Sequence, residues 1–119
     1  MRDHHKLDAF NLADELAILT YQMTRGFPQD ERFGLVAQMR RAAVSVASNI
    51  VEGCARRTQS DYLRFLDMAF GSLRELGYQF SLAHRLGYMD AKAYGPIGEK
   101  CEKTSKVLAG LIRSLRAKT

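Results

Sequence analysis

The spacing of apolar residues between positions 62 and 83 constrains the fold most strongly. These residues follow alternating steps of four and three, which places all of them on one stripe of an α-helix. They are Tyr62, Leu66, Ala69, Leu73, Leu76, Phe80 and Ala83. The pattern predicts a long amphipathic helix that buries one face.

Three other segments show the same helical periodicity. The segment before it carries the apolar stripe Val36, Met39, Ala43, Val46 and Ile50. The last segment carries Ile97, Cys101, Thr104, Leu108, Leu111 and Leu115. The first segment, residues 8–25, has a broader apolar surface, made of Phe10, Ala13, Leu16, Ala17, Leu19, Thr20 and Met23. That breadth predicts that the first helix is contacted on two sides.

Short stretches that contain glycine or proline separate these four segments. They lie at residues 26–28, 53–58 and 87–88. Short connections between long amphipathic helices favour antiparallel neighbours, and no segment shows the period-two alternation of a strand. We therefore predict an all-α protein, an antiparallel up-down-up-down four-helix bundle, formed by a single domain over residues 1–119.

The predicted second and third helices carry recognisable start signals. Pro28 suits the beginning of a helix, and Asp30 and Glu31 place negative charge in its first turn. Thr58, followed by Asp61, has the pattern of an N-cap residue before an acidic third position. We expect the second helix to begin near Pro28 and the third near Thr58.

The start of the fourth helix is less regular because of Pro96. Gly87 suits the left-handed position that ends the third helix, and Asp90 can cap the next element. Pro96 lacks a backbone donor and clashes inside a helix. Residues 90–94 therefore form a separate turn, or the helix is kinked at the proline. We expect the main helix to run from about Pro96.

Small and polar residues gather on the outer faces of the second and third helices. The second helix carries Gln38, Arg41, Ser45, Ser48 and Glu52 opposite its apolar stripe, and the third carries Asp67, Gly71, Arg74 and Tyr78. Short side chains and a mid-helix glycine let another backbone approach closely, and the glycine costs about 1 kcal/mol relative to alanine. We expect an interface between copies of the chain there. The alternative is an ordinary solvated face with a tolerated glycine.

The charge balance favours an anionic partner. The chain has 18 Lys and Arg against 13 Asp and Glu, a formal net charge of +5. Arg56 and Arg57 stand together in a predicted connection, with Arg64 close by and Arg40 on the second helix. Arginine suits bidentate phosphate contacts, so we predict RNA or DNA binding by these four residues. A solvated basic turn, and a scaffold that binds a partner protein, remain the alternatives.

Signatures of enzymes and metal sites are absent from the sequence. No glutamate is followed three residues later by histidine, and there is no CxxC pair or glycine-rich phosphate loop. His4 and His5 stand near the chain start, and we expect His84 to be a structural, partly buried imidazole. We predict a non-enzymatic protein without cofactor or metal.

Cysteine usage and hydropathy predict a cytoplasmic location. Cys54 and Cys101 are unclustered, which is typical of buried thiols in a reducing compartment. The N-terminal segment has no apolar region of a signal peptide, and no stretch is long and apolar enough to span a membrane.

Several motifs together resemble one known family. They are residues 27–35 (FPQDERFGL), 38–53 (QMRRAAVSVASNIVEG), 62–66 (YLRFL), 69–76 (AFGSLREL) and 86–88 (LGY). This combination resembles the small bacterial four-helix-bundle proteins encoded in intervening sequences of large-subunit ribosomal RNA genes. The resemblance implies a cytosolic bundle that assembles as a ring of five without established enzymatic activity. A related protein, the accessory variability determinant of diversity-generating retroelements, is a basic pentamer that binds nucleic acid.

Overall fold

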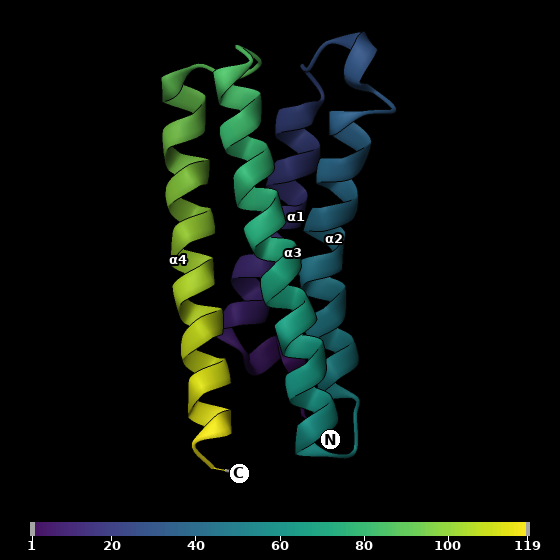
Figure 1. Cartoon of the computed structure of the whole chain (residues 1–119), viewed down its shortest axis with the longest axis vertical. Coiled ribbons are helices and arrows are strands. Elements are labelled where there is room, and N and C mark those ends of the chain that lie inside the picture. The colour runs from purple at the N-terminus through teal and green to yellow at the C-terminus, as the bar shows by residue number, and fades with distance from the viewer. Residues whose placement is uncertain (1, 119) are drawn as a thin grey trace.

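Four long helices lie side by side along the long axis of the molecule (Figure 1). This computed structural model describes residues 2–118. The helices are α1 (Asp8–Thr24), α2 (Leu35–Cys54), α3 (Gln59–Arg85) and α4 (Ala91–Arg116), and the short 3₁₀ turns η1 (His4–Lys6) and η2 (Gln29–Glu31) precede α1 and α2. No strand occurs between residues 2 and 118, so the prediction of an all-α protein with four helices is confirmed. Both chain ends lie at the same end of the molecule (Figure 1).

The core forms where the predicted apolar stripes meet. All the stripe residues predicted for α2 and α3 are buried. In α4 the stripe is buried from Ile97 to Leu108, whereas Leu111 and Leu115 are half-buried and Ile112 takes over the buried position. Cys54 and Cys101 are buried free thiols, as predicted. No helix among the described residues combines the length and apolarity needed to cross a bilayer.

Helix α1 packs against both α2 and α4, which confirms the prediction made from its broad apolar surface. Two of its buried residues are threonines, and their hydroxyls are satisfied within the helix. Thr20 Oγ1 donates to the carbonyl of Leu16 at 2.7 Å, and Thr24 Oγ1 donates to the carbonyl of Thr20 at 2.7 Å. The hydroxyls can therefore lie in the core because neither loses its hydrogen bond on leaving water.

The second helix begins later than predicted, at Leu35 instead of near Pro28. Pro28 instead precedes the short turn η2, which contains Asp30 and Glu31. The reason is the Glu31 side chain: its Oε1 accepts the backbone N–H of Leu35 at 3.1 Å, and its Oε2 accepts the hydroxyl of Tyr88 at 2.8 Å. Glu31 therefore caps α2 from outside the helix and joins η2 to the α3–α4 connection.

Glu31 makes stability depend on pH. The hydrogen bond from Leu35, and next the one from Tyr88, hold the pKa of the Glu31 carboxyl below its ordinary value of 4.5. A depressed pKa adds stability that is fully present above the ordinary value and is lost as the pH falls through the folded value. We expect Glu31→Gln to be less stable than the wild type at about pH 6, with the difference shrinking below about pH 4.5. Urea unfolding across this range measures it, and a difference that stays constant with pH would contradict the assignment.

The predicted ends of α3 are confirmed. Thr58 Oγ1 accepts the N–H of Asp61 at 3.1 Å at the N-terminus, and Gly87 has a φ of 85° just beyond the C-terminus. A second glycine, Gly53, lies where α2 meets α3. A Cβ built there would stand 3.0 Å from Cβ of Phe65 and 3.2 Å from Cδ1 of Tyr62. Glycine at this position permits the close approach of the two helices.

The fourth helix begins at Ala91, so the prediction of a main helix from about Pro96 was wrong. Asp90 caps it by accepting the N–H of Ala93 at 2.8 Å, and Pro96 lies inside the helix. Gly95, which precedes the proline, has no Cβ to clash with the proline ring. Packing also holds this end, since the Tyr94 ring stacks on the His84 ring with centroids 4.7 Å apart.

Candidate nucleic-acid interface

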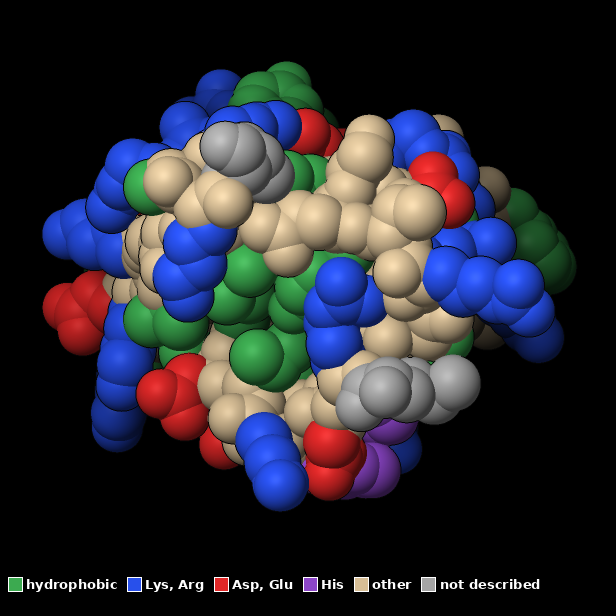
Figure 2. Space-filling view, turned by 90° about the horizontal axis from the view of Figure 1, so that it is seen from below, with side chains coloured by type: hydrophobic (Ala, Val, Ile, Leu, Met, Phe, Trp, Pro, Cys, Tyr) green, Lys and Arg blue, Asp and Glu red, His purple; other side chains and the backbone are tan. Residues whose placement is uncertain are grey.

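The end of the molecule that carries both chain termini is rich in Lys and Arg. Viewed from this end, blue basic side chains surround a green apolar centre, with red acidic side chains between some of them (Figure 2). The α2–α3 connection, residues 55–58, lies at this end and supplies Arg56 and Arg57. The N-terminal segment supplies Arg2. We call this surface the basic end.

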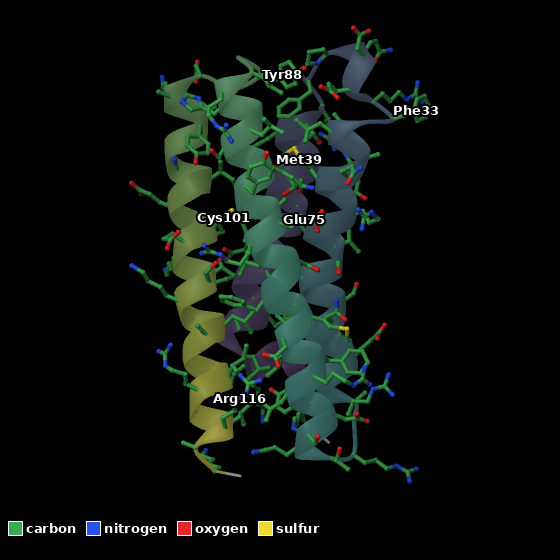
Figure 3. All side chains as sticks on the ribbon, viewed as in Figure 1. Phe33, Met39, Glu75, Tyr88, Cys101 and Arg116 are labelled. Atoms are coloured by element: carbon green, nitrogen blue, oxygen red, sulfur yellow. The ribbon has the colours of Figure 1, made fainter. Side chains whose placement is uncertain are left out.

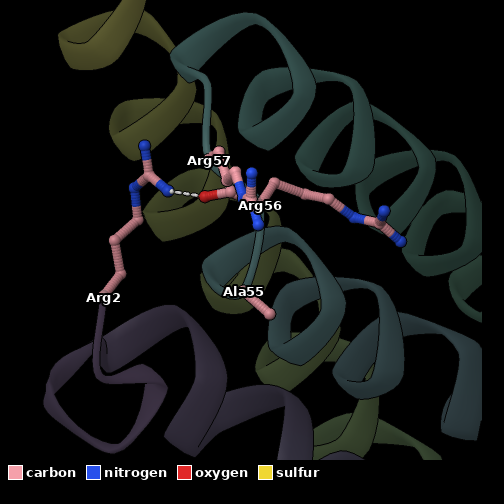
Figure 4. A pocket seen from close by; sticks show the side chains of 4 residues that line it. All are labelled: Arg2, Ala55, Arg56 and Arg57. Atoms are coloured by element: carbon pink, nitrogen blue, oxygen red, sulfur yellow. Dashed lines mark hydrogen bonds between the residues drawn. The ribbon is translucent and has the colours of Figure 1, made fainter.

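Three arginines line one hollow in the basic end. The hollow is lined by Arg2, Ala55, Arg56 and Arg57, and no carboxylate lies among these residues (Figure 4). Arg2 Nη1 donates to the backbone carbonyl of Arg56 at 2.8 Å, which ties the N-terminal segment to the connection. Three positive charges around an open hollow without a carboxylate favour the binding of an anion.

Local sequence explains why these arginines face outward. Helix α2 ends at Cys54, where the N–H of Ala55 bonds back to the carbonyl of Glu52 at 3.2 Å. Helix α3 cannot start before its cap residue, Thr58. Arg56 and Arg57 occupy the gap between the two helices and are exposed.

Aromatic rings orient the guanidinium groups. The Arg2 guanidinium lies 4.1 Å from the centroid of the Tyr62 ring, and the guanidiniums of Arg56 and Arg64 lie 4.4 and 4.7 Å from the centroid of the Phe65 ring. Stacking uses the flat face of a guanidinium and leaves its in-plane N–H donors available. The rings therefore fix the direction of the arginines without themselves neutralising the charge, and among the three arginines Arg64 also pairs with Asp61 at 3.4 Å.

The aromatic floor beneath the arginines is neutral and buried. Burial, followed by interaction with Cys54, raises the pKa of Tyr62 to about 12. Burial likewise raises the pKa of the Cys54 thiol. Neither group adds negative charge at neutral pH, so the arginine charge above them is not offset from below.

The structure brings together three of the four predicted nucleic-acid-binding residues. Arg56 and Arg64 share the Phe65 ring, and Arg57 follows Arg56 in the chain. Arg40 is elsewhere: its Nε donates to Thr24 Oγ1 at 3.0 Å against the C-terminal end of α1. Sixteen residues separate Arg40 from Arg56, about 24 Å along a helix. Arg40 therefore does not belong to the basic end.

Arg2 is a residue of the hollow that the sequence analysis did not select. Its contacts come from positions distant in sequence, including Arg56, 54 residues away. A single arginine near the chain start has no periodic partner, so no local pattern could identify it. Only the tertiary position of η1 beside α2 reveals it.

The residues predicted to form an interface face outward on this chain. Ser45 is half-buried, with its Oγ 2.9 Å from Ser72 Oγ across the α2–α3 contact. The others are exposed: Gln38, Arg41, Ser48, Glu52, Asp67, Gly71, Arg74 and Tyr78. Nothing lies within 4 Å of a Cβ built at Gly71, so its own chain places no helix or side chain there.

Arg41, which is predicted to lie in the interface, has polar partners within its own chain. Within the chain, Arg41 Nη2 lies 3.3 Å from Gln38 Oε1 and 4.0 Å from Glu75 Oε2 on α3. Asp67 also has a partner in the chain, accepting from Arg116 Nη2 at 2.5 Å. These exposed ion pairs contribute little stability.

The three histidines take structural positions. His84 Nδ1 lies 2.9 Å from the carbonyl of Met89, which agrees with the predicted structural role. His4 and His5 lie in the turn η1 with Asp3, where potential metal-ligating atoms lie within 4.8 Å of one another. Asp3 Oδ1 already accepts the N–H of His5 at 3.0 Å as the cap of this turn, and both histidine rings contact Phe10.

These features define a small helical-bundle protein with an arginine-rich end. The sequence matches the family described as 23S rRNA-intervening sequence protein over residues 5–110, and the chain belongs to that family. A solved structure with the same fold, of a protein of unknown function from the S23 ribosomal protein family of Bacteroides thetaiotaomicron, matches with a TM-score of 0.80 and 21% identity. The match covers 88% of this chain and 95% of that one. No curated protein matches the chain.

Proposed function

We propose that this protein binds RNA or DNA non-enzymatically, through phosphate contacts at the basic end. The observation that carries the proposal is the hollow that Arg2, Arg56 and Arg57 line, with no carboxylate among the lining residues. Arg64, stacked on the same ring as Arg56, lies beside the hollow on α3, where its Nη2 is also 3.4 Å from Asp61 Oδ1. Arginine donors arranged around a hollow match the geometry of phosphate oxygens.

The same geometry favours recognition of the backbone over recognition of bases. Proteins that stack bases do so on exposed aromatic faces. The rings at the basic end, Tyr62 and Phe65, are 3% and 7% exposed, and arginines already lie over them. The expected ligand is therefore a nucleic acid read by charge and backbone geometry, with weak dependence on sequence.

The proposal includes self-association of the protein in the cytoplasm. Each copy has the antiparallel up-down-up-down order, and copies meet through the outer faces of α2 and α3. The family resemblance supports a ring of five, and the exposed positions of Gly71 and Tyr78 leave these faces open to a second copy. Two buried free thiols suit a reducing compartment. Assembly would repeat the basic end around the ring and raise its local charge.

A binding assay with matched variants tests the phosphate site. We expect the double substitution Arg56→Ala, Arg57→Ala to weaken binding of single-stranded RNA roughly 25-fold at about 0.1 M salt, from the loss of two phosphate contacts. The control is Arg25→Ala, Lys92→Ala, which removes the same charge from exposed positions at the other end of the bundle. Equal losses in both variants would show that net charge alone drives binding, and no loss in either would exclude the basic end.

The scaffold alternative makes a different prediction for the same protein. If the protein is a scaffold ring that binds a partner protein, a pulldown from a lysate should recover proteins that remain bound after nuclease treatment. It should recover no nucleic acid. Nucleic acid that is recovered with the wild type and lost with Arg56→Ala, Arg57→Ala favours the phosphate site.

A further inference from the structure

Phe33 is the most exposed of the large apolar side chains. It is 86% exposed, and it projects from the bundle between η2 and α2 (Figure 3). The Arg32 guanidinium lies 5.2 Å from the centroid of its ring. An exposed phenylalanine ring offers a large apolar area that a partner can bury. We call these two residues the Arg32–Phe33 knob.

An acidic apolar groove lies at the same end of the molecule, between α2 and α3. It has a volume of about 500 Å³ and is lined by Leu35, Leu82 and Leu86 together with Glu31 and Glu75. No lysine or arginine lies among its lining residues. Leu86 is itself 50% exposed. The groove therefore offers apolar surface and negative charge, which are the two properties that complement the knob.

The groove wall also contains an amide oxygen without a partner. Gln79 is 94% buried, and its Nε2 donates to Glu75 Oε2 at 3.2 Å. That bond fixes the orientation of the amide, because the opposite orientation would place its oxygen against a carboxylate. No donor from the described residues reaches Gln79 Oε1. A buried acceptor without a donor is uncommon and is satisfied when a donor enters the site.

We infer that the Arg32–Phe33 knob of one copy docks in the groove of a second copy. The Phe33 ring packs on the leucines, and the Arg32 guanidinium meets the carboxylate of Glu75 and supplies a donor beside Gln79. Both complementary surfaces belong to this chain, which identifies the partner as another copy. The two surfaces differ, so the contact is heterologous. Each copy can use its knob to bind one neighbour and its groove to bind another. This inference rests on the self-association in the proposed function and specifies its contact.

Sedimentation equilibrium of the full chain tests the docking. We expect Phe33→Ala to raise the dissociation constant of self-association roughly 30-fold, the effect of losing a central aromatic anchor. The matched control is Ile18→Ala, which removes an apolar side chain that is 55% exposed on α1, outside the groove. Chemical unfolding of dilute samples checks that both variants keep the fold.

A charge exchange tests the orientation. Arg32→Glu and Glu75→Lys should each weaken assembly, and the double variant should recover at least part of it, since every copy then carries the reversed pair. Assembly of Phe33→Ala equal to that of the wild type would overturn the docking while leaving self-association and RNA binding in place. A wild type that sediments as a single copy at every concentration would overturn both the docking and the proposed self-association.

Discussion

We expect Leu16→Ala to lower the free energy of unfolding by about 2–5 kcal/mol, and Ile18→Ala to change it by less than about 0.5 kcal/mol. Leu16 is 0% exposed in the core of α1, and Ile18 lies two residues further along the same helix with most of its surface in solvent. Truncation of Leu16 loses apolar contact and leaves a cavity, because the surrounding helices cannot close around the missing atoms. Truncation of Ile18 removes atoms that contact mainly water.

The pair is informative because the two substitutions differ in little except burial. Both replace a four-carbon aliphatic side chain with alanine in one helix, and the gains in helix propensity differ by only about a few tenths of a kcal/mol. Urea unfolding of dilute protein, followed by far-UV circular dichroism, gives both free energies. Similar losses for Leu16→Ala and Ile18→Ala would contradict the burial of Leu16 in the core and the exposure of Ile18.

We expect the affinity of the wild type for single-stranded RNA to fall roughly 20-fold between about 50 and 200 mM salt. In the proposed complex, Arg2, Arg56 and Arg57 of one copy contact phosphates, and each such contact releases bound counterions. The expected slope of log affinity against log salt is about −2 for three contacts on a single strand. Filter binding or fluorescence anisotropy across that range measures the slope, and an affinity unchanged by salt would exclude phosphate contacts.

Helical periodicity was sufficient to predict the helices and their buried faces. A stripe such as the one from Tyr62 to Ala83 specifies which residues lie on one side of a helix. That apolar side is buried whichever helix packs against it. Capping residues were equally informative where the side chain acts on its own helix, as Thr58 does for α3. These signals are local, so one sequence contains them.

The predicted helix boundaries were wrong where a contact with a residue distant in sequence determines them. Glu31 caps α2 from the turn η2 while bound to Tyr88, 57 residues away. Helix α4 begins before Pro96 and continues through it, because Asp90 caps its first turn and Tyr94 stacks on His84. The cost of an internal proline is local, whereas the contacts that offset it are tertiary.

The candidate site likewise combines residues that local sequence identifies with residues that only tertiary packing places. Arg56 and Arg57 were identified because they lie together in one connection. Arg40 was assigned with them because periodicity gives the angle of a residue around its helix but not its distance along the bundle from the other residues. Arg2 joins the hollow only through tertiary packing of the N-terminal segment. Membership of a site that spans several elements could not be predicted from helix periodicity.

The most direct test of the phosphate site is the salt dependence of RNA binding for the wild type and for Arg56→Ala, Arg57→Ala, measured on one labelled single strand. Removal of two contacts should reduce the loss of affinity between about 50 and 200 mM salt from roughly 20-fold to roughly threefold. Arg25→Ala, Lys92→Ala should keep the wild-type slope. Parallel slopes for the wild type and Arg56→Ala, Arg57→Ala would contradict the account, since they would mean that Arg56 and Arg57 release no counterions on binding.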